Sequence, residues 1–254
     1  YRTGFDRNLW LWEQYNPEAT YMMAADVARG DGADFSVFHI VKLETMEIVG
    51  EYRGKPNLEQ FASILDSTGR EFGNCLLVVE NNSLGISILE KLQERGYPNL
   101  YYSIKGTHEY IDQLQAESIR NSVPGFTTSS KTRPLIVAKM EEFIRNKLIT
   151  IYSSRAVDEF KTFIWNNNKA EAMRSYHDDL VMALAIACWV RDTALTVNKK
   201  DLEYKRAMMD AMKLNSRKIQ TTIPGMQGHR QGVWSDNAKK EMQQQKDFIW
   251  LIKG

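Results

Sequence analysis

The chain has 254 residues, of which 43% are hydrophobic and 26% charged, with 15 Gly and 6 Pro. This composition excludes a collagen-like or low-complexity chain and predicts one large domain, or one domain with a tail. Two cysteines, Cys75 and Cys188, are too few for a disulfide framework or a structural zinc site. The longest apolar run, Leu180–Val190, is too short to span a bilayer. The chain opens with Tyr1 rather than Met, which predicts a piece of a longer protein.

Charge is distributed unevenly along the chain. Residues 1–197 hold 21 Lys and Arg against 26 Asp and Glu, a net charge of −5, whereas residues 198–254 hold 12 against 6, a net charge of +6. An acidic body has no general attraction for a polyanion, so any nucleic-acid binding there must be local. We expect a connecting segment at 1–19, one domain at 20–197 and a basic tail at 198–254.

The first half of the domain alternates between apolar runs and turn residues. We expect hairpin-linked strands over Tyr21–Asp26, Phe35–Lys42 and Met46–Tyr52. A helix begins at Asn57, which has capping-box spacing with Gln60, and ends near Gly69. A buried strand over Cys75–Val79, a helix over Ser83–Arg95 and a strand over Leu100–Ile104 follow.

The second half is predicted to be mainly helical. Residues 105–134 are rich in Ser, Thr, Gly and Lys and are expected to form a loop. Helices are expected over Pro134–Asn146, Arg155–Trp165 and Tyr176–Arg191, with a short strand over Leu148–Tyr152 and a basic tail helix over 198–218. Three hairpin strands followed by alternating helices and strands predict an α/β fold, a mixed sheet with helices on both faces in the ribonuclease H-like order.

Acidic residues occur where buried strands end. Asp26 ends the first strand, Glu80 follows the fourth, and Asp178 and Asp179 begin the last helix of the domain. Carboxylates beside buried strands are costly unless they are paired or metal-bound. If the first and fourth strands are neighbours, these carboxylates converge at one sheet edge and form an oxygen-ligand site that suits Mg²⁺. Two such ions would activate a water and stabilise the leaving oxygen of a phosphodiester.

Each of these residues also has an ordinary structural explanation. Asp26 can cap the turn that follows it, and Glu80 can accept hydrogen bonds from loop amides. Asp178 has capping-box spacing with Ser175 and can serve its own helix, whereas Asp179 shares a helical face with apolar residues and should face the core. We therefore predict Asp26, Glu80 and Asp179 as catalytic metal ligands, with Asp178 as a neighbouring or substitute ligand.

Other polar residues accompany this predicted site. Asp34 either caps a turn or approaches a metal, and His177 is expected to be a surface or capping residue. Asn81 and Asn82 either hydrogen-bond Glu80 or DNA, or are turn residues. The loop 125–134 carries hydroxyls and cations that suit phosphate oxygens but read no bases. The candidate DNA contacts are Lys105, Lys131, Arg133 and Lys139, each equally well explained as solvated surface.

Four segments carry these residues: Met23-Ala-Ala-Asp26-Val-Ala-Arg-Gly30 with Asp34-Phe-Ser36, Leu77-Val-Val-Glu80-Asn-Asn82, Gly125-Phe-Thr-Thr-Ser-Ser-Lys-Thr-Arg-Pro134 and His177-Asp-Asp-Leu-Val-Met-Ala-Leu-Ala185. Together and in this order they resemble the C-terminal nuclease domain of the large terminase subunit of tailed bacteriophages, of the large contractile-tailed coliphage type. The match spans residues 20–192. Relatives often carry Asp where this chain has Met182, which argues against a fourth ligand there.

The resemblance implies a ribonuclease H-like, metal-dependent endonuclease that cuts concatemeric double-stranded viral DNA with little sequence preference. It places the family's three metal ligands on Asp26, Glu80 and Asp179. It implies two Mg²⁺ ions as the cofactor, for which Mn²⁺ can substitute. The tail at 198–254 matches only in length and position and is a candidate portal-docking segment.

The resemblance also implies partners. These are the portal protein, the small terminase subunit and the N-terminal ATPase domain of the full-length protein. That domain is not expected here because the sequence contains no GxxxxGK[ST] motif, and residues 1–19 would be the remnant of the link to it. The implied location is the host cytoplasm, at the procapsid portal during packaging and not in the mature virion, with no membrane contact.

Two other functions fit the same residues. One is a structure-selective resolvase or a transposase-like strand transferase of the same fold. The other is a non-catalytic module that grips DNA and docks to the portal, in which the acidic cluster is vestigial. An actin-like kinase is disfavoured because Gly-rich phosphate loops are missing.

Overall fold

The computed structural model describes residues 2–3, 7–28, 34–82, 84–104, 110–111, 122–166 and 169–192. The chain separates into two units, residues 1–200 and 201–254, and every described residue belongs to the first. The predicted tail at 198–254, its helix over 198–218 and the candidate DNA contact Lys105 lie outside the described residues. Within the described ranges, no helix has the length and apolar character needed to cross a membrane.

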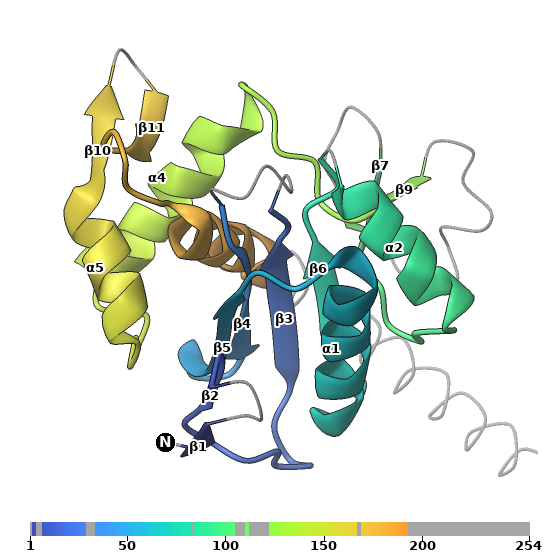
Figure 1. Cartoon of the computed structure of the whole chain (residues 1–254). Coiled ribbons are helices and arrows are strands. Elements are labelled where there is room, and N and C mark those ends of the chain that lie inside the picture. The colour runs from blue at the N-terminus through green and yellow to red at the C-terminus, as the bar shows by residue number, and fades with distance from the viewer. Residues whose placement is uncertain are drawn as a thin grey trace, which may run out of the picture. The chain divides into compact units, whose positions relative to one another are not determined.

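A six-stranded mixed sheet lies at the centre of the domain, in the order β1-β2-β5-β4-β3-β6 (Figure 1). Strands β3 (Tyr21–Asp26), β4 (Ser36–Lys42) and β5 (Glu47–Gly54) are antiparallel, and β6 (Leu76–Val79) pairs with β3 in parallel. The predicted mixed sheet is therefore confirmed, and the first and fourth predicted strands are neighbours, which was the condition for the acidic residues to converge. Strands β1 (Arg2–Thr3) and β2 (Leu9–Leu11) extend the sheet beyond β5, so the segment expected to be a connection also contributes edge strands.

Both faces of the sheet are covered by helices, so side chains on either face of a strand are buried. Successive residues of a strand point to opposite faces. Met23 and Ala25 of β3 pack in one core with α1 (Leu58–Glu71) and α2 (Gly85–Glu94). Met22 and Ala24 pack in the other core with α4 (Thr132–Arg145) and the helix over residues 179–192. By the same alternation, Asp26 belongs to the face covered by this last helix.

Helix α1 begins as the sequence predicts. Asn57 accepts a hydrogen bond from the Gln60 backbone N–H at 2.8 Å, and its own backbone N–H donates to the Gln60 side chain at 3.1 Å. The predicted capping box is therefore confirmed. Helix α2 has Leu84 at its N-cap position and no side-chain cap there, while Ser83, the predicted cap, lies outside the described residues.

The region predicted as a loop at 105–134 contains regular structure. Strands β8 (Tyr110–Ile111) and β9 (Ser122–Pro124) flank β7 (Tyr102–Ile104) in a small antiparallel sheet. Helix α4 begins at Thr132, two residues before the predicted start at Pro134. Ser129 and Thr132 bond each other's backbone N–H through their hydroxyls, which stabilises this earlier start.

Three further expectations for the second half were wrong. Residues 148–152 form no strand; Thr150 makes an isolated parallel bridge to Glu47 through its N–H to the Met46 carbonyl and its carbonyl to the Ile48 N–H. Helix α5 (Ser154–Thr162) stops before Phe163, and the aromatic and β-branched residues after it form β10 (Phe163–Asn166), which pairs with β11 (Lys169–Ala172). The last helix begins at residue 179 rather than at Tyr176.

Candidate metal centre

Two acidic residues lie at the same edge of the sheet because the strands that carry them are parallel neighbours. Asp26 is the last residue of β3, and Glu80 directly follows β6. The Glu80 backbone N–H donates to the Ala25 carbonyl at 2.9 Å, which continues the β3–β6 ladder to the level of Asp26. The structure thus brings the first two predicted ligands together.

The backbone around Glu80 is held by two glycines. A Cβ on Gly85, at the start of α2, would lie only 1.8 Å from the Glu80 carbonyl oxygen. Gly125 has a φ of +80°, and a Cβ there would lie 2.5 Å from the Val79 carbonyl oxygen. Only glycine permits both close approaches. The Glu80 side chain accepts a hydrogen bond from Asn82 Nδ2 at 2.8 Å, and Asn82 also donates to the Thr128 carbonyl at 3.0 Å.

Asp179 is the first residue of the helix over 179–192 and is 8% exposed. Its Oδ2 accepts the Phe35 backbone N–H at 3.0 Å. The next residue is held by two buried side chains: the Leu180 N–H donates to Glu159 Oε2 at 2.8 Å, and its carbonyl accepts from His39 Nε2 at 3.0 Å. The start of this helix is therefore anchored at the Asp179 carboxylate and at the Leu180 backbone.

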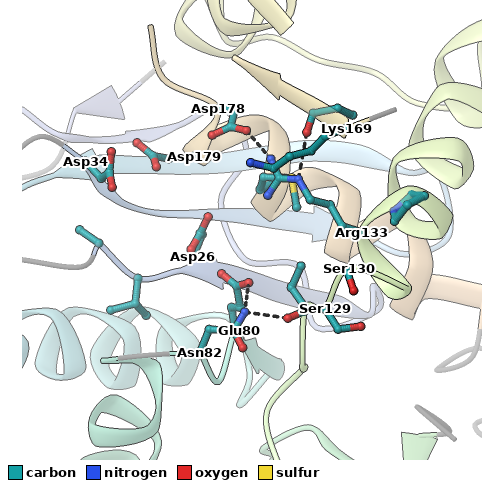
Figure 2. Close-up of a pocket in the computed structure, with 16 residues that line it drawn as sticks. Asp26, Asp34, Glu80, Asn82, Ser129, Ser130, Arg133, Lys169, Asp178 and Asp179 are labelled. Atoms are coloured by element: carbon teal, nitrogen blue, oxygen red, sulfur yellow. Dashed lines mark hydrogen bonds and ion pairs between the residues drawn. The ribbon is translucent and has the colours of Figure 1, made fainter. Parts of the chain in front are cut away.

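Five carboxylates line one cavity of about 580 Å³ (Figure 2). They come from segments far apart in the sequence: Asp26, Asp34, Glu80, Asp178 and Asp179. The remaining polar part of the wall comprises Asn82, Thr128, Ser129, Ser130, Arg133 and Lys169. With five carboxylates and two cationic side chains among the described lining residues, the cavity is strongly acidic.

Burial and neighbouring carboxylates disfavour the charged forms of Asp26 and Asp179. Burial, followed by the neighbouring Glu80 carboxylate, raises the pKa of Asp26 well above its usual value. Burial also raises the pKa of Asp179 to about 6; repulsion from Asp34 and Asp178 adds to this effect, and the Phe35 N–H opposes it. A bound cation would relieve this repulsion. Carboxylate oxygens are the donors that hard divalent ions such as Mg²⁺ and Mn²⁺ prefer, so the residues present fit such a metal.

The two adjacent aspartates have different surroundings. Asp178 forms an ion pair with the Arg133 guanidinium, whose Nε also donates to the Ala170 carbonyl at 2.9 Å. Asp178 precedes the helix, and its carbonyl accepts the Met182 N–H at 2.8 Å, so it is not the third residue of a capping box as one alternative proposed. Asp179 has no Lys or Arg partner among the residues that the structure describes. This geometry favours Asp179 over Asp178 as the third ligand.

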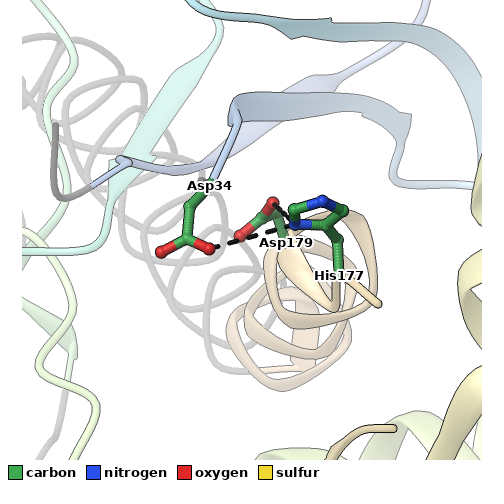
Figure 3. A group of neighbouring side chains, drawn as sticks. All are labelled: Asp34, His177 and Asp179. Atoms are coloured by element: carbon green, nitrogen blue, oxygen red, sulfur yellow. Dashed lines mark ion pairs between the residues drawn. The ribbon is translucent and has the colours of Figure 1, made fainter. Parts of the chain in front are cut away.

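His177, which was expected to be a surface or capping residue, lies at the edge of the acidic cluster. Figure 3 shows its ring beside Asp34 and Asp179. His177 Nδ1 is 3.9 Å from Asp34 Oδ1 and 3.8 Å from Asp179 Oδ2. One ligand atom from each of the three lies within 4.8 Å of the others, close enough to share a metal ion. Asp34, predicted as an alternative ligand, therefore adjoins the site together with an imidazole.

The predicted DNA contacts are only partly gathered at the cavity. Arg133 lines it, but its guanidinium is bonded to Asp178 and to Ala170. Lys131 is exposed at the N-cap of α4 and does not line the cavity. Lys139 also lies outside the lining and pairs with Glu142 and Asp192.

Several residues of the site were not predicted. Lys169 comes from the β10–β11 hairpin, whose signal was the run of three Asn between Trp165 and Lys169. Glu159 and His39 act on Leu180 from distant segments, and no local pattern in the sequence indicates either contact. Of the two asparagines after Glu80, Asn82 bonds its carboxylate, as one alternative proposed, whereas Asn81 bonds the Pro124 carbonyl.

No protein-family model matches the sequence. Among solved structures, the chain is similar to the large terminase nuclease from thermophilic phage G20c with bound magnesium and to the same nuclease with bound cobalt. Each has a TM-score of 0.58 and 20% identity, and each match covers 74% of this chain and 88% of that chain. The large terminase nuclease domain of Thermus phage P74-26 matches with a TM-score of 0.55 and 20% identity over 71% of this chain and 84% of that chain. The chain therefore has the fold of the large terminase nuclease domains, as its motifs implied.

Proposed function

We propose that this chain is a divalent-metal-dependent endonuclease that cuts double-stranded DNA as the nuclease part of a large terminase subunit. The observation that carries the proposal is the convergence of Asp26, Glu80 and Asp179 from three distant segments into one acidic cavity. The likeness to phage terminase nucleases with bound magnesium or cobalt supports it. The order of the four sequence motifs supports it independently.

In this proposal Asp26, Glu80 and Asp179 hold the metal, with Asp34 and Asp178 at its margin. Two bound Mg²⁺ ions would supply Lewis acids for water and for the leaving oxygen of the phosphodiester. The protein's own contribution is orientation. Asn82 fixes the Glu80 carboxylate, and the Phe35 N–H fixes that of Asp179.

The rest of the cavity wall suits a DNA phosphate. Ser129, Ser130 and Arg133 lie at the N-terminal end of α4, where a helix dipole and its first N–H groups favour an anion. Thr128 also lines the cavity, and its buried hydroxyl has no hydrogen-bond partner among the described residues. Hydroxyl and backbone groups of this kind bind phosphate without reading bases, so we expect little sequence preference.

The proposal extends to the setting that the motif resemblance implies. Concatemeric viral DNA is the substrate, and the ATPase domain of the full-length protein, the portal protein and the small terminase subunit are the partners. Cutting would take place at the procapsid portal in the host cytoplasm. Access to DNA would be limited by these partners, because the cavity itself is open to solvent through exposed residues such as Lys169.

Nicking of supercoiled plasmid by the purified chain tests the proposed activity. We expect cutting with Mg²⁺ or Mn²⁺, none with EDTA, and a loss of about 100-fold or more in Asp26→Asn, Glu80→Gln and Asp179→Asn. Asp158→Asn is the matched control, since this exposed carboxylate pairs with Lys161 away from the cavity. Circular dichroism verifies that each variant is folded.

The outcomes separate the alternative functions. A folded wild-type chain that binds DNA but never cuts it would favour the non-catalytic gripping module. Much faster cutting of branched than of linear DNA would favour a resolvase-like enzyme. Activity that survives Asp179→Asn but is lost in Asp178→Asn would move the third ligand by one residue.

A further inference from the structure

The β10–β11 hairpin presents apolar side chains that the fold does not bury. Trp165 is 62% exposed and Ile164 is 42% exposed. A two-stranded hairpin cannot cover both of its own faces. The two side chains point to opposite faces, because they are successive residues of β10. Figure 1 shows the hairpin extending from the end of α5 beside α4.

The register of the hairpin places Trp165 on the face that packs against α4. Trp165 is the direct cross-strand partner of Ala170, so the two side chains share a face. Ala170 is 2% exposed and belongs to the same core cluster as Ile136 and Met140 of α4. Ala170 also lines the acidic cavity, as does Lys169 beside it. Trp165 does not itself line the cavity, but it is the cross-strand neighbour of a residue that does.

A specific contact ties the hairpin to the acidic cluster. The Arg133 guanidinium donates to the Ala170 carbonyl through Nε and pairs with Asp178 through Nη2. One side chain thus sets the position of the hairpin strand relative to the residue that precedes Asp179. The position of the hairpin relative to the cavity is therefore fixed, and a DNA strand with a phosphate in the cavity would contact the hairpin.

We propose that the β10–β11 hairpin is a DNA-contacting element and that the Trp165 indole packs against a base or sugar next to the bond that is cut. Aromatic rings stack on bases of any sequence, and apolar side chains of DNA-binding proteins also wedge between base steps. Lys169, on the opposite face of the hairpin and paired with Glu171 at 2.6 Å, also lines the cavity. This inference rests on the proposed nuclease function, and its occupant is the DNA held in that cavity.

The test compares Trp165→Ala with Trp165→Phe and with Ile164→Ala, which removes an exposed apolar side chain from the opposite face of the same strand. Binding is measured by fluorescence anisotropy of a labelled duplex in Mg²⁺, with every protein also carrying Glu80→Gln so that the duplex stays intact. We expect Trp165→Ala to weaken binding on the order of 10-fold, Trp165→Phe to retain most of the affinity and Ile164→Ala to bind normally. The change in intrinsic fluorescence on adding DNA should be smaller in Trp165→Phe, since DNA no longer contacts that indole.

Equal affinities and equal fluorescence changes in all of these proteins would overturn the inference. Equal weakening by Trp165→Ala and Ile164→Ala would also overturn it, because both effects would then come from a disturbed hairpin. The plasmid assay without Glu80→Gln separates the two proposals. If the wild-type chain nicks plasmid and Trp165→Ala nicks and binds DNA as well as the wild type, the hairpin proposal alone is overturned. If the wild-type chain never nicks plasmid, the nuclease proposal is overturned. The hairpin proposal is then decided by the anisotropy measurement.

Discussion

Replacing Asp179 by Asn should stabilise the metal-free protein while abolishing the proposed cutting. Asn keeps a side-chain oxygen that can accept the Phe35 N–H, now bonded at 3.0 Å, but it carries no charge. Burial raises the pKa of Asp179 from 3.8 to about 6, and Asp34 and Asp178 add to this rise. At neutral pH the folded protein therefore carries an ionised, buried carboxylate next to others of the same sign.

The size and the pH range of the effect follow from this pKa. Because the folded state binds the proton more tightly than the unfolded chain, the group's contribution to stability is fully present below pH 3.8 and is lost as the pH rises through about 6. A shift of about two units corresponds to about 3 kcal/mol above both values. The hydrogen bond from the Phe35 N–H is already included in this shift, since it lowers the pKa of Asp179. The new Asn amide N–H₂ group must find partners of its own in a buried position, which costs about 1 kcal/mol. We expect a net gain of about 2 kcal/mol for Asp179→Asn at neutral pH.

Urea unfolding followed by circular dichroism in EDTA measures this difference. The free energy of unfolding of the variant should exceed that of the wild type at about pH 7.5, and the two values should be similar at about pH 4. Saturating Mg²⁺ should then raise the free energy of unfolding of the wild type above that of the variant, because only the wild type binds the metal well. Asp158→Asn, which removes an exposed carboxylate, should change little. An Asp179→Asn protein that is less stable than the wild type in EDTA at neutral pH, or a difference that does not vary with pH, would refute the reasoning.

The contacts around the site lead to three other predictions. Glu159→Ala should lower the free energy of unfolding by about 3 kcal/mol, because it leaves the Leu180 N–H and Arg53 without their buried partner. Glu159→Gln should cost only about 1 kcal/mol, and equal losses in urea titrations would contradict this contact. Gly85→Ala should lower both the melting temperature and the nicking rate, since its Cβ would meet the Glu80 carbonyl; a normal rate would show that the backbone yields there. Mg²⁺ should raise the melting temperature of the wild type reversibly with EDTA but not that of Asp26→Asn, and an equal rise in both would place the ion elsewhere.

Local patterns were sufficient for β3, β4, β5 and β6 of the central sheet and for the start of α1, but not for the edge strands β1 and β2. Continuous apolar runs identified β3 and β6, and the Asn57–Gln60 spacing identified a capping box, because each signal involves residues close in the chain. The β10–β11 hairpin was missed because the predicted helix over Arg155–Trp165 was extended through β10. The tertiary contact of Ala170 with α4 favours the strand conformation there, and that contact has no local signature.

The sequence by itself determined where the acidic residues of the candidate site fall along the chain. Carboxylates at the ends of buried strands are rare without a partner, so the positions of Asp26, Glu80 and the Asp178–Asp179 pair along the chain are enough to indicate a cation site. Only the tertiary structure decided the surroundings of each carboxylate. Arg133 neutralises Asp178 from 45 residues away, and Phe35 reaches Asp179 across 144 residues. Such contacts depend on how the helices pack on the sheet, and no spacing along the chain encodes them.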